Sequence, residues 1–201
     1  NQMVKQTKGD INYYIDVTNG NDSNNGLTSG TAFKTIAKAI GLIPQIVNHN
    51  VTVNVISGTY PEIVIISGFS GKGYIKLIGA DNLSDNYLIQ NIIIGYNNCR
   101  VRVQGFKCTS SNSDSILVTA SNFIELFYIK SDSNALSNSG INIANSNVTV
   151  LGCLISNKLY ALGAGQLSNV ASRNWTVGSG NTYGIYANYG SNVSKEGTQP
   201  Q

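Results

Sequence analysis

Ser146-Asn147-Val148-Thr149-Val150 is one copy of a pattern that recurs through the second half of the chain. A small polar residue and an asparagine stand before a short apolar alternation. The same order is found at Asn97-Asn98-Cys99, Ser121-Asn122-Phe123, Ser168-Asn169-Val170 and Ser191-Asn192-Val193. The steps between these motifs are 24, 25, 22 and 23 residues. A repeat of this length, with strands of three to five residues between polar corners, predicts a solenoid in which each repeat forms one coil.

Each repeat contains two further short strands. A run such as Ile141-Asn142-Ile143 precedes the motif, and a run such as Cys153-Leu154-Ile155 follows it. Asn, Ser and Gly suit the corners because they tolerate left-handed or turning backbone. Equivalent residues of successive coils would then stack about 4.8 Å apart. We therefore expect an all-β, single-stranded parallel β-helix of about six coils of 22–26 residues, with a β-sandwich as the alternative fold.

The composition agrees with short strands joined by polar corners. The 201 residues are 41% hydrophobic and 11% charged, and they include 27 Asn, 22 Ser and 21 Gly, a mixture that argues against a helical bundle. A net charge of +3 without a basic run argues against nucleic-acid binding, and no apolar run is long enough for membrane insertion. Cys99, Cys108 and Cys153 form no CxxC motif, so we expect small buried residues instead of disulfides or metal ligands.

The first fifty residues follow a different pattern. Tyr13–Val17 predicts a strand, residues 19–30 form a polar loop, and Phe33–Ile40 carries the apolar stripe of a helix with Thr31 as its N-cap. We expect this helix to cover the open end of the first coil. One structural domain would then consist of residues 1–50 (strand, loop and capping helix), 51–195 (β-helix) and 196–201 (polar tail). The last coil has no such cap, so we expect a fragment of a longer protein or subunit association there.

Several segments carry a family resemblance: Tyr14-Ile15-Asp16-Val17, Gly20–Gly26, Phe33–Ile40 and Ser57-Gly58-Thr59-Tyr60-Pro61-Glu62. Together they resemble the entry of the pectin-lyase-like right-handed parallel β-helix superfamily, over residues 12–195. Gly68–Gly73 and the Ser-Asn coils are similar to tail and baseplate appendage proteins of bacteriophages and prophages, including tailspikes. The resemblance implies a right-handed coil.

The same resemblance implies a viral structural and receptor-binding protein. Such a module would be a homotrimer on the virion tail or baseplate, or at the cell surface. It would contact other tail or baseplate proteins and cell-surface polysaccharide or teichoic acid. Because the superfamily also holds hydrolases, lyases and adhesins, a polysaccharide depolymerase and a bacterial surface adhesin are the alternatives.

An enzymatic role would depend on Glu125, the one acid inside a coil strand, with Arg102 beside it. The repeat stacks one outward column in the order Lys76, Arg102, Glu125, Thr149, Ala171, Ser194. Glycoside hydrolysis uses two carboxylates, and only the corner residues Asp114 and Asp132 could supply a second one. The acid cluster of the superfamily's lyases is missing, and the one histidine, His49, precedes the first coil. These observations favour a non-enzymatic role and leave Glu125 and Arg102 as the catalytic candidates.

Aromatic residues gather late in the chain, and they are candidates for a glycan platform, a subunit interface or coil packing. They are Tyr160, Trp175, Tyr183, Tyr186 and Tyr189.

The polar loop near Asp16 and Asp22 is the only calcium candidate. An EF-hand loop closes with a glutamate twelve positions after its first aspartate, and position 27 is Leu. We expect no metal and no cofactor, with calcium near these two residues as the alternative.

Overall fold

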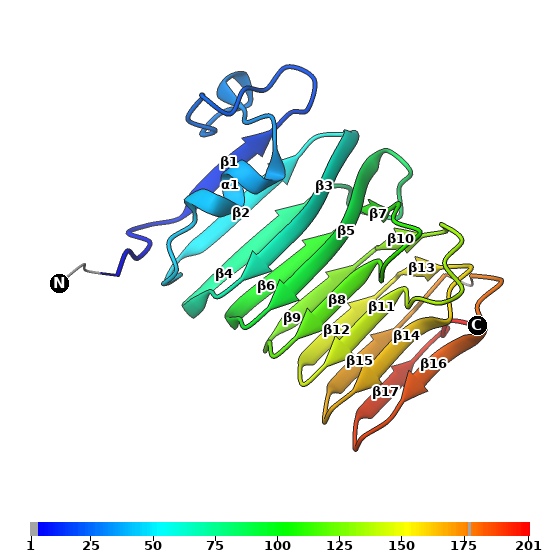
Figure 1. Ribbon diagram of the computed structural model, residues 1–201. Helices are drawn as coiled ribbons and strands as arrows, with labels where there is room; N and C mark the ends of the chain where they lie inside the picture. Colours follow the sequence, from blue (N-terminus) through cyan, green and yellow to red (C-terminus); the bar gives the residue numbers. More distant parts are fainter. Residues whose placement is uncertain (1–3, 177) are drawn as a thin grey trace.

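The computed structural model describes residues 4–176 and 178–201, and it is a parallel β-solenoid of about six turns (Figure 1). The predicted parallel β-helix is therefore confirmed. One parallel sheet, here called sheet A, stacks strands from successive parts of the chain along the solenoid. Its order is β1 (Ile11–Ile15), β2 (Asn50–Val55), β4 (Ser70–Ile78), β6 (Asn98–Gln104), β9 (Ile124–Phe127), β12 (Asn147–Leu151), β15 (Asn169–Arg173) and β17 (Asn192–Glu196).

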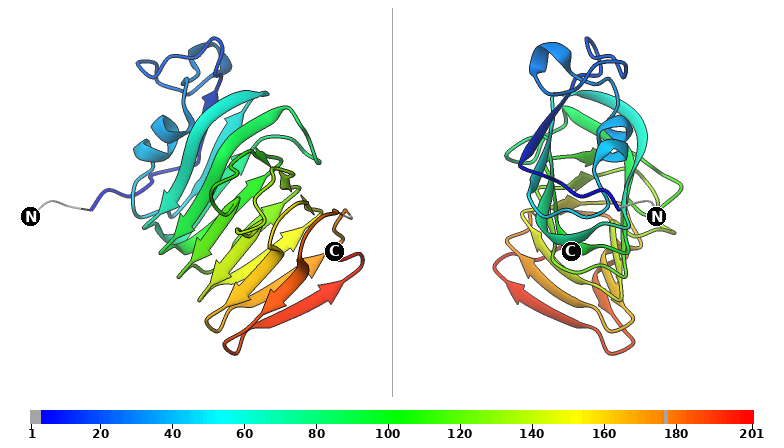
Figure 2. Two further views of the ribbon diagram at one scale, coloured as in Figure 1. Left: turned by 45° about the vertical axis from the view of Figure 1, so that its right-hand side comes forward. Right: turned by 90° about the vertical axis from the view of Figure 1, so that its left-hand side faces the viewer.

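The second sheet, sheet B, faces sheet A across the core (Figure 2). It contains β3 (Gly58–Ser67), β5 (Tyr87–Gly95), β8 (Ile116–Thr119), β11 (Ile141–Ala144), β14 (Tyr160–Gly165) and β16 (Tyr183–Ala187). Short strands continue from the first half of β5 and form a third side of the coil, as the repeat predicted. They are β7 (Lys107–Cys108), β10 (Lys130–Ser131) and β13 (Leu154–Ile155).

The register of sheet A agrees with the column expected from the repeat. Arg102 pairs with Lys76 and Glu125, and Thr149 pairs with Glu125 and Ala171, which pairs with Ser194. The neighbouring positions point inward, so that Ile124 and Val148 stack directly in the core. Alternation along each strand therefore separates the apolar core from one outward face of sheet A.

The serine of the repeated motif forms a ladder inside the corner between sheets B and A. The backbone N–H of Ser121 donates to Ser146 Oγ at 3.1 Å, and the N–H of Ser146 donates to Ser168 Oγ at 3.3 Å. In the same way, the backbone N–H of Ser168 donates to Ser191 Oγ at 3.1 Å. Each hydroxyl of the buried members also donates to a carbonyl of its own coil. A small side chain with an acceptor oxygen satisfies the buried N–H of the preceding coil at this corner, which explains the recurring serine.

The N-terminal helix starts later than the sequence predicts. Helix α1 spans Ile36–Leu42 and its N-cap is Thr35, whose Oγ1 accepts from the Lys38 N–H at 3.2 Å. Thr31 lies in the 3₁₀ turn η1 (Ser29–Thr31), so its assignment as N-cap is wrong. Phe33 is extended and pairs with the end of β1: its N–H donates to the Tyr14 carbonyl, and its carbonyl accepts from Asp16, both at 2.9 Å. This pairing prevents the helix from beginning at Phe33.

Helix α1 covers the N-terminal end of the core, as expected. It contacts β1, β2 and β3 and buries Ile36, Ala39 and Ile40 (Figure 1). Within the described ranges, no helix has the length and apolar character needed to cross a bilayer. Cys99, Cys108 and Cys153 are free and buried, so the predicted burial of these residues is confirmed. Burial raises the pKa of the Cys99 thiol to about 11.

The polar tail at residues 197–201 lies against the last coils. The Trp175 N–H donates to the Thr198 carbonyl at 2.8 Å, and Ser172 Oγ donates to Gln199 Oε1 at 2.7 Å. The strands of the last turn remain largely exposed, and Val193 is only partly buried. The core is therefore less complete at this end than at the end that α1 covers.

Candidate functional site

A shallow groove of about 670 Å³ lies on the outward face of sheet A, across β9, β12, β15 and β17. Its floor is the part of the outward column formed by Thr149, Ala171 and Ser194. The same column holds the long side chains Arg102 and Glu125 on the preceding coils. The hollow therefore begins where the column changes from long to small side chains.

The asparagine of the repeated motif lines one side of this groove through Asn147, Asn169 and Asn192. Asn122, Asn147, Asn169 and Asn192, here called the asparagine ladder, are linked side chain to side chain. Nδ2 of each of the last three donates to Oδ1 of the preceding member, at 2.6, 3.1 and 3.3 Å. An amide has two N–H donors and two acceptor lone pairs, so each linked asparagine keeps hydrogen-bonding capacity for a ligand.

Glu125 closes one end of the groove and is held by three side chains. Its Oε1 accepts from Arg100 Nη2 at 2.7 Å, and its Oε2 accepts from Arg102 Nε at 2.7 Å. The Tyr74 hydroxyl also donates to Oε2. The Tyr74 ring in turn lies 4.6 Å from the Arg100 guanidinium and 4.7 Å from Lys76 Nζ. The Glu125 side chain is only 15% exposed, so this network is partly removed from solvent.

These contacts keep Glu125 ionised. Burial by itself would raise the pKa of Glu125, but the hydrogen bonds from Tyr74, Arg100 and Arg102 together lower that pKa below its ordinary value. A general acid near neutral pH needs the opposite shift. The arrangement is therefore that of an ion-pair network and not of a proton donor.

The structure separates Glu125 from the two acids considered as its partner. Asp114 precedes β8 in sheet B, where its carboxylate accepts from the Ser139 N–H at 2.6 Å and from Asn142 Nδ2 at 2.8 Å. Asp132 follows β10 on the third side and pairs with Lys107 at 2.9 Å. Neither carboxylate lines the groove, so the described residues do not form a pair of acids there.

Sequence reasoning singled out Glu125 and Arg102 but missed Tyr74 and Arg100. Both lie two residues before a member of the outward column, Lys76 and Arg102 respectively. Residues two apart on a strand share a face, so the alternation in the sequence contained this signal.

The late aromatic residues do not form one surface. Tyr160 stacks on Tyr183 and Tyr186, with ring centroids 5.4 and 4.6 Å apart, on the outward side of sheet B. Trp175 is 3% exposed and its Nε1 donates to Ser172 Oγ at 3.0 Å, so this residue belongs to the core. Tyr189 lies by itself at a corner and is 75% exposed.

The two aspartates of the polar loop accept hydrogen bonds from neighbouring backbone and side-chain groups. The Asp16 carboxylate accepts from the Thr18 and Asn19 N–H groups at 2.8 and 2.9 Å. Asp22 accepts from the Lys34 and Thr35 N–H groups and from the Thr35 hydroxyl, at 2.8 to 3.0 Å. Both carboxylates therefore stabilise the loop by accepting hydrogen bonds from residues within it or next to it. In the part of the chain that the structure describes, no three His, Cys, Asp or Glu side chains gather in a way that could hold a metal.

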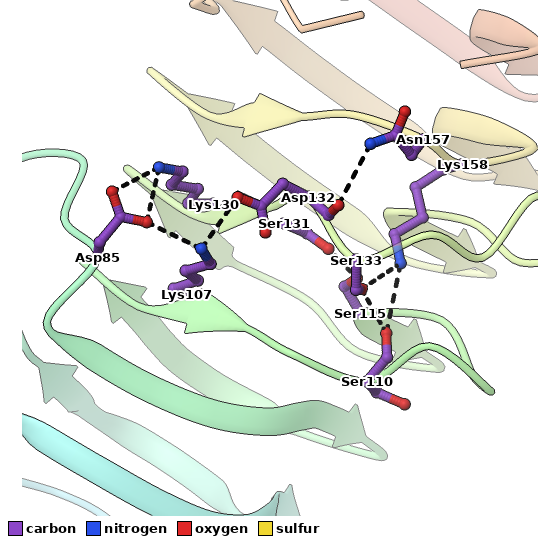
Figure 3. Close-up of polar contacts among 10 residues, drawn as sticks. All are labelled: Asp85, Lys107, Ser110, Ser115, Lys130, Ser131, Asp132, Ser133, Asn157 and Lys158. Carbon is purple, nitrogen blue, oxygen red and sulfur yellow. Dashed lines mark hydrogen bonds and ion pairs between the residues drawn. The ribbon is translucent and has the colours of Figure 1, made fainter. Parts of the chain in front are cut away.

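A second polar cluster lies on the third side of the coil (Figure 3). Asp85 pairs with Lys107 at 2.9 Å and with Lys130 at 2.7 Å at the surface. Further inside, Lys158 is fully buried, and its Nζ donates to Ser133 Oγ at 3.0 Å and to the Ser110 carbonyl at 3.4 Å. Lys158 thus links three successive coils and lines none of the hollows described here.

No protein-family model, curated protein or solved structure matches this chain.

Proposed function

We propose that this protein is a non-enzymatic module of a phage or prophage tail appendage, and that the groove on sheet A binds a cell-surface polysaccharide or teichoic acid. The resemblance of the N-terminal segments to the entry of the pectin-lyase-like superfamily supports the first part of the proposal. The proposal includes assembly as a homotrimer on the virion, and the exposed last turn supports an association there.

The asparagine ladder carries the proposal for the groove. Its amides repeat once per coil, about every 4.8 Å, which is close to the length of one sugar unit in an extended polysaccharide. Each amide offers a donor and an acceptor, and sugar hydroxyls need both. The small floor residues Thr149 and Ser194 add hydroxyl groups and leave room for the ligand.

Binding without cleavage is supported by the contacts of Glu125, because both oxygens of this lone carboxylate in the groove already accept hydrogen bonds. Its carboxylate accepts from Tyr74, Arg100 and Arg102, and its lowered pKa keeps it ionised. Glu125 and Arg102 remain the candidates for catalysis if the protein is a depolymerase.

The test is binding of the purified chain to immobilised bacterial wall glycans, including teichoic acid, followed by titration of the best binder. Ala171→Arg places a long side chain on the floor of the groove and should lower affinity at least about tenfold. Asn12→Arg is the matched control, because Asn12 lies in the same outward column on β1, far from the groove. Absence of binding to every wall glycan, or binding that Ala171→Arg leaves unchanged, contradicts the proposal.

The same samples separate binding from catalysis. New reducing ends or unsaturated products that disappear in Glu125→Gln would assign a depolymerase instead. Light scattering at high protein concentration tests the trimer.

A further inference from the structure

A second hollow, of about 430 Å³, lies at the corner between sheets B and A on the last turns. Asn145, Gln166, Leu167 and Tyr189 line it, and all four are exposed. Leu167 is 71% exposed and Tyr189 is 75% exposed. We call this hollow the corner pocket. It offers two large apolar side chains and two amides to solvent, and its lining contains no charged residue.

All four lining residues have left-handed backbone. Their φ angles are 48°, 55°, 62° and 47° for Asn145, Gln166, Leu167 and Tyr189. Glycine adopts this conformation without strain, whereas leucine and tyrosine rarely adopt it. The same corner contains Gly190 at φ 72°, so glycine is compatible with it. The corner geometry therefore does not explain why Leu167 and Tyr189 stand here.

Leu167 is also held in place by the next coil. Its N–H donates to the Tyr189 carbonyl at 3.1 Å. A Cβ atom on Gly190 would come within 2.9 Å of Leu167 Cδ2, so the glycine makes room for the leucine side chain. Leu167 and Tyr189 are therefore exposed together at one corner, and large apolar side chains that gather at one exposed place are a feature that points to ligand contact.

We propose that the corner pocket is a second binding site, separate from the groove, for one uncharged sugar unit. The Tyr189 ring and Leu167 would pack against the C–H face of the sugar, and the Asn145 and Gln166 amides would hydrogen-bond its hydroxyls. Because the lining contains no charged side chain, it offers no ion pair to an acidic sugar. This proposal does not depend on occupation of the groove.

The experiment is saturation-transfer NMR on the full chain with three uncharged probes, maltotriose, cellotriose and triacetylchitotriose, at up to about 10 mM. At least one probe should bind. Leu167→Asn and Tyr189→Asn should each weaken that binding about tenfold, whereas Tyr189→Phe, which keeps the ring, should retain it. Asn12→Arg should leave it unchanged, because Asn12 lies on β1 and lines neither the groove nor the corner pocket.

Stability measurements distinguish loss of the site from loss of the fold. Asparagine adopts left-handed backbone more readily than leucine or tyrosine, so both asparagine variants should keep or raise the Tm. Tyr96→Asn is the matched control: Tyr96 is 72% exposed with φ 57°, but it does not line the corner pocket. It should keep or raise the Tm in the same way and bind the probe normally.

Three results would overturn the proposal. The first is that none of the probes binds. The second is probe binding that Leu167→Asn and Tyr189→Asn do not weaken. The third is a change of oligomeric state in these variants without any change in probe binding, which would make the corner pocket a contact between copies of the chain.

Discussion

Arg102 on β6 and Glu125 on β9 are register neighbours on successive coils, and Arg102 Nε donates to Glu125 Oε2 at 2.7 Å. A single exposed ion pair contributes at most about 1 kcal/mol. Glu125 differs because it also accepts from Arg100 and Tyr74 and is largely shielded from solvent. The four side chains therefore act as one network, in which loss of the carboxylate leaves two guanidinium groups without their counter-charge.

Glu125→Gln should lower the free energy of unfolding by about 1–3 kcal/mol near neutral pH, because charge-assisted hydrogen bonds are lost. The measurement is urea denaturation. Tyr74, Arg100 and Arg102 lower the pKa of Glu125 in spite of its burial. The stabilisation is therefore present above the unfolded-state pKa and is lost as pH falls through the lower folded-state value. The difference between wild type and Glu125→Gln should shrink on acidification below about pH 5.

Glu196→Gln is the matched control for this prediction. Glu196 pairs with Arg173 at 3.1 Å on the same sheet, but its side chain is 68% exposed. This variant should change the free energy of unfolding by no more than about 0.5 kcal/mol. Equal effects of the two variants would show that the Glu125 network is no stronger than a surface pair.

Ser146→Ala should destabilise the corner ladder by about 1–3 kcal/mol. The hydroxyl of Ser146 accepts from the buried Ser121 N–H, and that donor has no other partner once the hydroxyl is removed. Ser137→Ala is the control, because Ser137 is exposed and its hydroxyl donates to the side chain of its neighbour Asn138. Chemical denaturation of both variants checks the prediction, and an unchanged midpoint for Ser146→Ala would contradict it.

The repeat made the solenoid and one of its columns predictable. Ser-Asn motifs at nearly constant spacing fix which residues stack, so that Arg102, Glu125 and Thr149 were placed in register from the sequence. The hydrogen bonds along the corner then follow from the residue types. Each serine is hydrogen-bonded to the equivalent serine of the next coil, and each asparagine to the equivalent asparagine. In a repeat protein each coil contacts only its neighbours, so aligning the repeats in the sequence predicts which residues are in contact.

The two ends and the sites were less predictable because they depend on contacts without a repeat. Helix α1 starts at Ile36 because Phe33 pairs with β1 and Asp22 binds the Lys34 N–H, and neither contact has a periodic signal. Trp175 enters the core beside Ser172, where the inward column changes from valine to serine. The corner pocket depends on backbone angles at Leu167 and Tyr189, which composition does not reveal.

Glu62→Ala should loosen the first turn of helix α1. The Glu62 carboxylate reaches from β3 and accepts from the Ile36 and Ala37 N–H groups at 3.0 and 2.9 Å. Loss of such an N-terminal acceptor costs about 0.5–2 kcal/mol. Amide hydrogen exchange at Ile36 and Ala37 should become faster, whereas Glu62→Gln, which keeps one acceptor oxygen, should show a smaller change. Unaltered exchange in Glu62→Ala would contradict the assigned contact.

Lys158→Met tests the buried lysine, whose ammonium group is fully enclosed and has only neutral acceptors, Ser133 Oγ and the Ser110 carbonyl. Burial lowers the pKa of Lys158 in spite of the carboxylates at a distance. The folded state therefore binds this proton more weakly than the unfolded state. As a result, the free energy of unfolding rises as the pH increases toward the unfolded-state pKa of the lysine. Methionine fills a similar volume without a charge. Near neutral pH, the free energy of unfolding of Lys158→Met should therefore lie between that of wild type and a value about 3 kcal/mol higher. In urea denaturation, the free energy of unfolding of wild type should rise relative to that of the variant as the pH rises toward the unfolded-state lysine pKa of about 10.4. A wild type that instead loses stability relative to Lys158→Met over this range would mean that the cation itself is stabilised in the folded state.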